Sequence, residues 1–84
     1  MGNRPNIEGL LFRIVTALVD DPTEVRVAST KTATGTVLQV VVAKGDQGKV
    51  IGKAGRTARS LRELLYAMGV AAKTRYQLDI DTTS

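Results

Sequence analysis

The residues best suited to binding chemistry are concentrated in one run, Gly45–Leu61, with the sequence GDQGKVIGKAGRTARSL. This run holds four glycines and four basic side chains. Glycine lets a backbone approach another molecule closely, and cations attract anions. The run therefore suits a nucleotide cradle of an enzyme, a clamp on a nucleic-acid backbone, or a mobile surface loop.

The spacing of the glycines excludes the two common nucleotide cradles. A Walker loop needs a glycine five positions before Gly52, where Gln47 stands. It also needs a serine or threonine after Lys53, where Ala54 stands. A dinucleotide-binding loop needs a glycine two positions before Gly52, where Val50 stands, and a preceding strand with a parallel crossover. Both templates fail, and the clamp is favoured.

We call Gly52–Gly55 the GKAG turn, after its sequence. It is expected at the amino end of a helix, where free backbone amides and the positive end of the helix dipole attract phosphate. Lys53 adds a charge within the turn, and Arg56 and Arg59 follow on the first helical turns. The same spacing occurs in Gly45–Gly48, the GDQG turn, which has an acid and no cation and is interpreted as a strand-to-helix connection.

The composition argues against catalysis. The chain of 84 residues contains no cysteine and no histidine, which removes thiolate nucleophiles, imidazole bases and nearly all transition-metal sites. Its carboxylates are scattered over expected strand edges and helix ends. We therefore expect no catalytic residue, no metal and no cofactor.

The positive charge is concentrated around the glycines. Of the net charge of +4, Lys44–Arg62 contributes six cations and one acid, whereas the rest of the chain contributes six cations and seven acids. A basic segment on a near-neutral body is the footprint expected for an anionic partner. No apolar run approaches the length of a membrane span and no signal-peptide core is present, so a cytoplasmic location without membrane contact is expected.

Hydrophobic periodicity predicts two long helices, one short helix and three strands. Apolar residues at helical spacing between Ile7 and Leu18 predict a first helix, with Asn3 or Asn6 as its cap and Asp21-Pro22 as its stop. Asp46 is the expected N-cap of a short helix that runs to Ile51. The remaining predictions are a strand at 24–31, turn residues at 32–35, a central strand at 36–44, a helix at 56–68 that ends at Gly69, and a marginal strand at 75–82.

The resulting order is α-β-β-α-α-β. It predicts an α+β domain in which helices pack on one face of a three-stranded sheet. We expect a single domain at 1–84, made of a helix and hairpin at 4–44, a helix-turn-helix at 46–69 and the final strand at 75–82.

The stretch VIGKAGRTA resembles the signature of KH domains, in which a Gly-x-x-Gly loop joins two helices. The element order resembles the type II, bacterial form, and the likeness covers essentially the whole chain. The chain looks most similar to the small single-domain bacterial KH proteins of the KhpA family. One departure is Ala58, where the family often has a larger aliphatic residue.

The resemblance implies a groove that holds about four nucleotides of single-stranded RNA, or of single-stranded DNA, with the GKAG turn on the phosphates. Carried over by position, the RNA-binding residues are Lys49, Val50, Ile51, Gly52, Lys53, Ala54, Gly55, Arg56 and Arg59.

The resemblance also implies partners. The favoured function is a non-catalytic RNA-binding protein that acts as a post-transcriptional regulator or RNA chaperone, with the ribosome as one site of action. The alternative is a protein-interaction subunit that forms homodimers, or heterodimers with a larger KH-domain protein, and for which RNA binding is incidental. Leu64 and Tyr66 on the second long helix are the candidate dimer interface.

Overall fold

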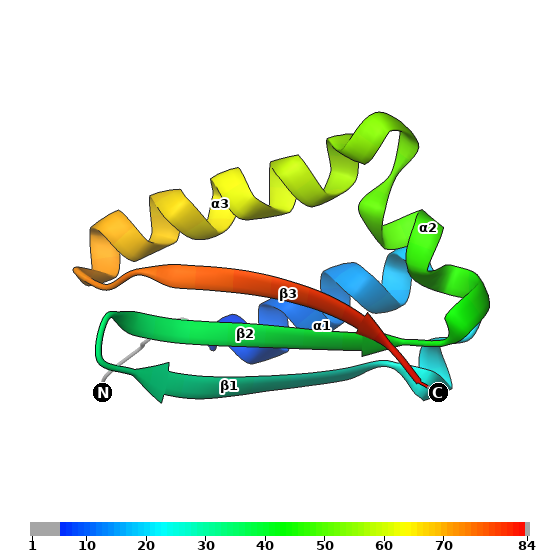
Figure 1. Cartoon of the computed structure of the whole chain (residues 1–84), viewed down its shortest axis with the longest axis horizontal. Helices are drawn as coiled ribbons and strands as arrows, with labels where there is room; N and C mark the ends of the chain where they lie inside the picture. Colours follow the sequence, from blue (N-terminus) through cyan, green and yellow to red (C-terminus); the bar gives the residue numbers. More distant parts are fainter. Residues whose placement is uncertain (1–5, 84) are drawn as a thin grey trace.

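The computed structural model describes residues 6–83, which form three helices and a three-stranded sheet (Figure 1). The order is α-β-β-α-α-β, which confirms the predicted fold class. The main elements are α1 (Ile7–Leu18), β1 (Arg26–Thr32), β2 (Gly35–Val42), α2 (Gln47–Ile51), α3 (Arg56–Ala72) and β3 (Tyr76–Thr82). Short 3-10 turns lie at Pro22–Glu24, Lys44–Asp46 and Lys53–Gly55.

The sheet has the order β1-β2-β3, so β2 is central as predicted. β1 and β2 are antiparallel and pair from Arg26 opposite Val41 to Thr32 opposite Gly35, which leaves a two-residue turn between them. β2 and β3 are parallel. A parallel pair requires a long crossover, and here the crossover contains α2, the GKAG turn and α3.

One face of the sheet forms the core. Leu38, Val40 and Val42 of β2 are buried, whereas Gln39 between them is exposed. Because side chains of a strand alternate between its two faces, the helices cover one face only, as Figure 1 shows. The helices contribute the other side of the core, namely Leu11, Val15, Val50, Leu61 and Leu65. Each fully buried side chain of this kind contributes roughly 1.5–3 kcal/mol.

The first helix begins as predicted at Asn6, whose side-chain oxygen accepts a hydrogen bond from the Gly9 amide at 3.0 Å. The alternative cap, Asn3, lies outside the described residues.

The prediction that Gly69 ends the second long helix is wrong. α3 continues to Ala72, and Lys73 adopts the left-handed conformation that terminates it (φ 57°, ψ 42°). Gly69 lies inside the helix and is buried. A Cβ there would stand 2.6 Å from the carbonyl oxygen of Thr74, so the glycine permits a close approach of the chain that leads into β3.

Asp46 stands at the N-cap position of α2 but does not cap it, contrary to the prediction. Its carboxylate makes no hydrogen bond to the first turn of the helix. It points instead at the loop after α1, as described below.

Candidate nucleic-acid interface

The GKAG turn has a backbone that few side chains tolerate. Three of its four residues have positive φ: Gly52 (φ 81°, ψ 169°), Ala54 (φ 56°, ψ 26°) and Gly55 (φ 74°, ψ 13°). The amide of Gly55 donates to the carbonyl oxygen of Gly52 at 3.1 Å, which closes the turn. The turn projects at the upper right of Figure 1, beyond the end of the sheet.

The two glycines of the turn are needed for different reasons. The conformation of Gly52 is available essentially only to glycine, and a Cβ there would also overlap the side chain of Thr57. Gly55 has open space around the position of a Cβ and is constrained only by its left-handed conformation. The sequence Gly-x-x-Gly is therefore a structural requirement of this turn.

The start of α3 has no side-chain cap. Gly55 occupies the N-cap and has no side chain to accept hydrogen bonds from the first helical amides. α3 is 17 residues long, and the positive end of its dipole lies at the turn. This arrangement favours an anion such as a phosphate group.

Cations surround these donors. Lys53, Arg56 and Arg59 are all exposed. Within residues 6–83, both ion pairs belong to Lys49, so these three side chains are not neutralised by a carboxylate. Their charges are available to a ligand.

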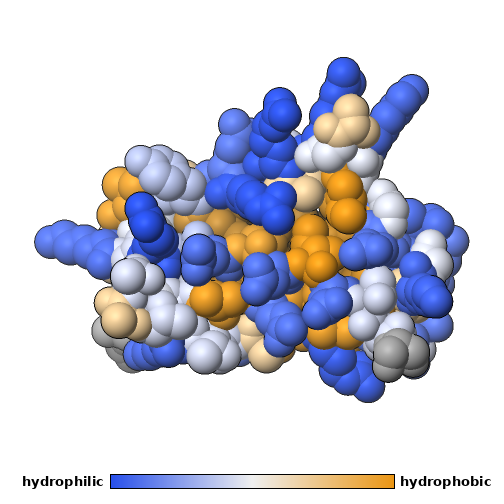
Figure 2. Space-filling model, in the orientation of Figure 1, coloured by the Kyte–Doolittle hydropathy of each residue, from blue (hydrophilic) through white to orange (hydrophobic). Residues whose placement is uncertain are grey.

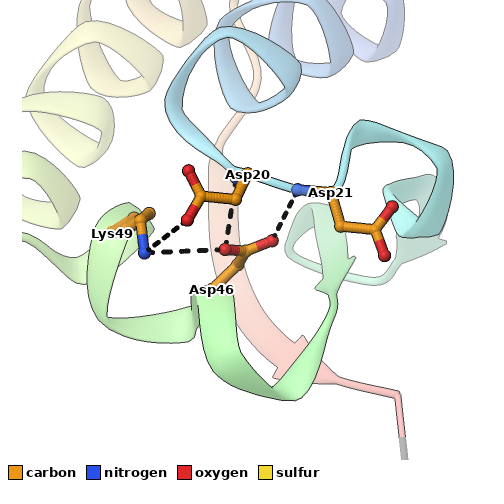
Figure 3. A network of polar contacts seen from close by, with 4 residues as sticks. All are labelled: Asp20, Asp21, Asp46 and Lys49. Carbon is orange, nitrogen blue, oxygen red and sulfur yellow. Dashed lines mark hydrogen bonds and ion pairs between the residues drawn. The ribbon is translucent and has the colours of Figure 1, made fainter.

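Lys49 is placed differently. Its ammonium lies 3.2 Å from a carboxylate oxygen of Asp20 and 3.7 Å from one of Asp46 (Figure 3). The hydrogen bond and the negative charge of Asp20, helped by Asp46, raise the pKa of Lys49 above its ordinary value. The charge predicted to meet RNA is thus shared with two carboxylates on the side of α1.

Asp46 is the centre of this network. Its side chain is only 6% exposed and accepts hydrogen bonds from the backbone amides of Asp20 at 3.2 Å and Asp21 at 3.0 Å. The carboxylate ties the loop after α1 to the start of α2 (Figure 3). The GDQG turn is therefore a structural connection, in agreement with its interpretation from the sequence.

The two apolar residues before the GKAG turn, Val50 and Ile51, differ in burial. Val50 is fully buried at 0% exposure and offers no surface to a ligand, so its predicted role in contacting RNA is not supported. Ile51, by contrast, is 36% exposed beside the turn. Ala58, the departure from the family pattern, is buried in the first part of α3.

A strip of hydrophobic atoms is exposed between α3 and β3, bordered by hydrophilic side chains (Figure 2). Arg62 crosses from α3 to β3, where its Nη2 donates to the carbonyl oxygen of Leu78 at 3.4 Å. Arg62 is not among the residues that the sequence predicts for the site. The signal was present in its spacing, because Arg56, Arg59 and Arg62 follow at intervals of three along one helix.

The two candidate dimer residues point in different directions. Leu64 is 41% exposed and lines a small cleft with residues of α1, whereas Tyr66 is 73% exposed and lies on the side of the GKAG turn. Residues two apart in a helix are separated by roughly 200°. A partner that contacted both would have to span the exposed face of α3.

No helix within the described part of the chain is long and apolar enough to cross a membrane. Residues 6–83 also contain no group of three or more acidic, histidine or cysteine side chains that could hold a metal ion.

Comparison with known proteins places this geometry in a family. The model of the KhpA/KhpB KH domain matches residues 8–80. The chain is 51% identical to the RNA-binding protein KhpA of Treponema pallidum over 73 residues, which cover 87% of this chain and 91% of the relative. It is 43% identical to the RNA-binding protein KhpA of Bacillus subtilis over 75 residues, or 89% of this chain and 93% of the relative.

The fold and the turn thus define a KH domain. The chain belongs to the KhpA/KhpB KH-domain family, which confirms the resemblance seen in its sequence. This family is not enzymatic, and the chain is accordingly not an enzyme.

Proposed function

We propose that this protein binds single-stranded RNA without catalysis and holds the phosphates at the GKAG turn. The observation that carries the proposal is the turn itself, which stands at the positive end of the α3 dipole beside Lys53, Arg56 and Arg59, three exposed cations that form no ion pair within residues 6–83. The relatives of this chain that are named RNA-binding proteins support it.

The bases have an apolar surface to meet. Ile51 and the hydrophobic strip between α3 and β3 adjoin the turn, and Val50 supports Ile51 from within the core. KH domains bind about four nucleotides in this way. Lys49 contributes less than Lys53, because Asp20 and Asp46 already neutralise it.

In the cell, this binding would serve post-transcriptional regulation or RNA chaperone activity in the cytoplasm, including work at the ribosome. A small domain that binds phosphates mainly at one turn suits roles in which RNA is bound and then released. Single-stranded DNA offers the same phosphates, and a comparison of RNA and DNA oligonucleotides of one sequence measures the preference.

The test is the double substitution Lys53→Asp with Ala54→Asp. It places two negative charges where the phosphates would lie, and aspartate tolerates the left-handed backbone of Ala54. We expect fluorescence anisotropy with a labelled single-stranded RNA to show an affinity loss of roughly tenfold or more. For the unmodified protein, log K should fall with log salt at a slope of roughly −2 to −3.

The matched control is Lys31→Asp with Ala33→Asp, which makes the same charge change at the β1–β2 turn, at the opposite end of the molecule (Figure 1). Both residues are exposed. The control should retain most of the affinity. Equal losses in the two variants, or an affinity that does not depend on salt, would exclude the GKAG turn as the phosphate site.

We further propose that the protein associates through α3, as a homodimer or with a larger KH-domain protein. The second half of this helix, Leu64–Ala72, contains no charged residue, and it exposes Leu64 and, at 62%, Val70. Val70→Lys should lower the dimer fraction in sedimentation velocity, whereas Gln77→Lys on the open face of the sheet should not. An unchanged dimer fraction, or a protein that is monomeric at every concentration, would contradict self-association through this face.

A further inference from the structure

A hollow of about 650 Å³ lies beside the GKAG turn, on the first half of α3. It is open to solvent and is lined by Ala54, Gly55, Arg59, Arg62, Glu63 and Tyr66. We call it the α3 hollow. Its position next to the proposed phosphate site means that a strand held by the turn could place a neighbouring nucleotide in it.

Arg62 reaches across this part of the surface and makes one long hydrogen bond, at 3.4 Å, to β3. Its Nη2 donates to the carbonyl oxygen of Leu78, and β3 is an edge strand. Alternate residues of an edge strand turn their backbone groups away from the sheet. The amide of Thr36 donates to the carbonyl of Arg75, and the amide of Thr83 donates to the carbonyl of Val42. Odd-numbered residues in and around β3 therefore turn their backbone groups toward β2. The carbonyl of Leu78, an even-numbered residue, faces away from the sheet.

The guanidinium of Arg62 keeps most of its donors. Arginine has five N–H donors in a planar fork, and the hydrogen bonds of residues 6–83 use one of those of Arg62. No carboxylate within the same residues forms an ion pair with it. Most donors of this planar group are therefore open to a ligand beside β3.

The other walls of the hollow indicate what it would bind. Glu63 brings a carboxylate acceptor next to the donors of Arg59 and Arg62, so the hollow offers hydrogen-bond donors and an acceptor together. It suits a neutral group that carries both acceptors and donors, as a nucleobase does. Tyr66 is 73% exposed, and its ring offers a surface on which a base can stack. Ala54 and Gly55 have small side chains or none and leave space for the base.

We propose that the α3 hollow is a base-binding subsite in which Arg62 selects guanine. Guanine presents two adjacent acceptors, O6 and N7, that match the paired donors of an arginine. Adenine has an amino group in place of O6 and would oppose a donor with a donor. This proposal rests on the proposed RNA-binding function and adds a sequence preference to it.

The test uses uridine hexamers that carry one guanine at each position in turn, with adenine at the same position for comparison. The unmodified protein should prefer guanine at one position by roughly 5- to 100-fold. Arg62→Lys keeps the charge but loses the fork, so it should remove most of this preference and change the affinity for the adenine hexamer little. The control is Arg13→Lys on α1, which lies outside both the hollow and the GKAG turn and should keep the preference.

A measurement on the unmodified protein completes the test. Replacing the preferred guanine by 7-deazaguanine removes N7 and should weaken binding about threefold or more. A protein that binds RNA through the GKAG turn but shows no guanine preference, or keeps it in Arg62→Lys, would overturn the selection by Arg62. Loss of the proposed function would look different, because Lys53→Asp with Ala54→Asp would then leave RNA binding intact.

Discussion

The chain contains the spacing Gly-x-x-Gly twice, and the two turns have opposite structures. In the GDQG turn neither glycine has positive φ, and nothing lies within 4 Å of the place where a Cβ would stand. In the GKAG turn both glycines have positive φ, and Gly52 has no room for a Cβ. The spacing alone therefore does not define a binding turn.

The two turns also direct their charges differently. Asp46 of the GDQG turn is buried and bonded to the loop after α1, whereas Lys53 of the GKAG turn is exposed and unpaired among residues 6–83. The charged side chain of the GDQG turn stabilises the tertiary structure, whereas the charged side chain of the GKAG turn is exposed to solvent. Backbone conformation and the direction of charge thus separate a structural turn from a candidate ligand site.

The largest effect should come from exchanging one glycine of each turn for alanine. Gly52→Ala should destabilise the fold by about 3 kcal/mol or more, because the backbone is glycine-specific and the methyl group would overlap Thr57. Gly48→Ala lies in α2 with open space and should stabilise the fold by about 0.5–1 kcal/mol. Urea unfolding measures the free energy of unfolding of both variants. Similar changes in this free energy would contradict the structural difference between the turns.

Removing the buried carboxylate should have the next largest effect. Asp46→Ala leaves the amides of Asp20 and Asp21 without their acceptor and should cost about 1–3 kcal/mol. RNA affinity measured below the unfolding transition should change little, since the GKAG turn keeps its own cations. A variant of full stability that binds RNA poorly would reverse the roles assigned to the two turns.

A smaller effect is expected for Gly55→Ala. The position has space for a methyl group, so the left-handed conformation is its only penalty, about 1 kcal/mol. Gly45→Ala has no such penalty and serves as the control. A loss at Gly55 as large as that at Gly52 would point to a steric requirement that the structure does not contain.

The smallest effect concerns the pH dependence of Lys49. Its pKa is raised above the ordinary value of 10.5, chiefly by Asp20. A raised lysine pKa contributes stability that is complete below the unfolded value and is lost as the pH rises through the folded value. The melting temperatures of the protein and of Lys49→Met should therefore differ slightly at neutral pH and converge above pH 10.5. A difference that grows at alkaline pH would contradict the ion pair.

Local patterns in the sequence were sufficient for much of this molecule. The helical spacing from Ile7 to Leu18, the β-branched run of β2 and the cap at Asn6 depend on neighbours in the chain, and the structure confirms them. The GKAG turn was found because its glycines, its cations and its helix lie together in the sequence.

The errors arose where distant residues decide the outcome. Asp46 fits the rule for a cap, but its partners are the amides of Asp20 and Asp21, 26 and 25 residues away. Gly69 fits the rule for a helix end, but the glycine is needed because the chain at Thr74 returns close to the helix. Arg62 resembles any solvated helix residue until β3 is placed opposite it.

The parallel pairing of β2 with β3 has a consequence for synthesis of the protein. Thr36 pairs with Tyr76, so the sheet cannot close until the intervening helices have been made and the last strand has followed them. On the ribosome, the GKAG turn leaves the exit tunnel before β3, the strand that braces α3 through Arg62, is free to dock. Translation therefore delivers the GKAG turn before the strand that packs beside α3.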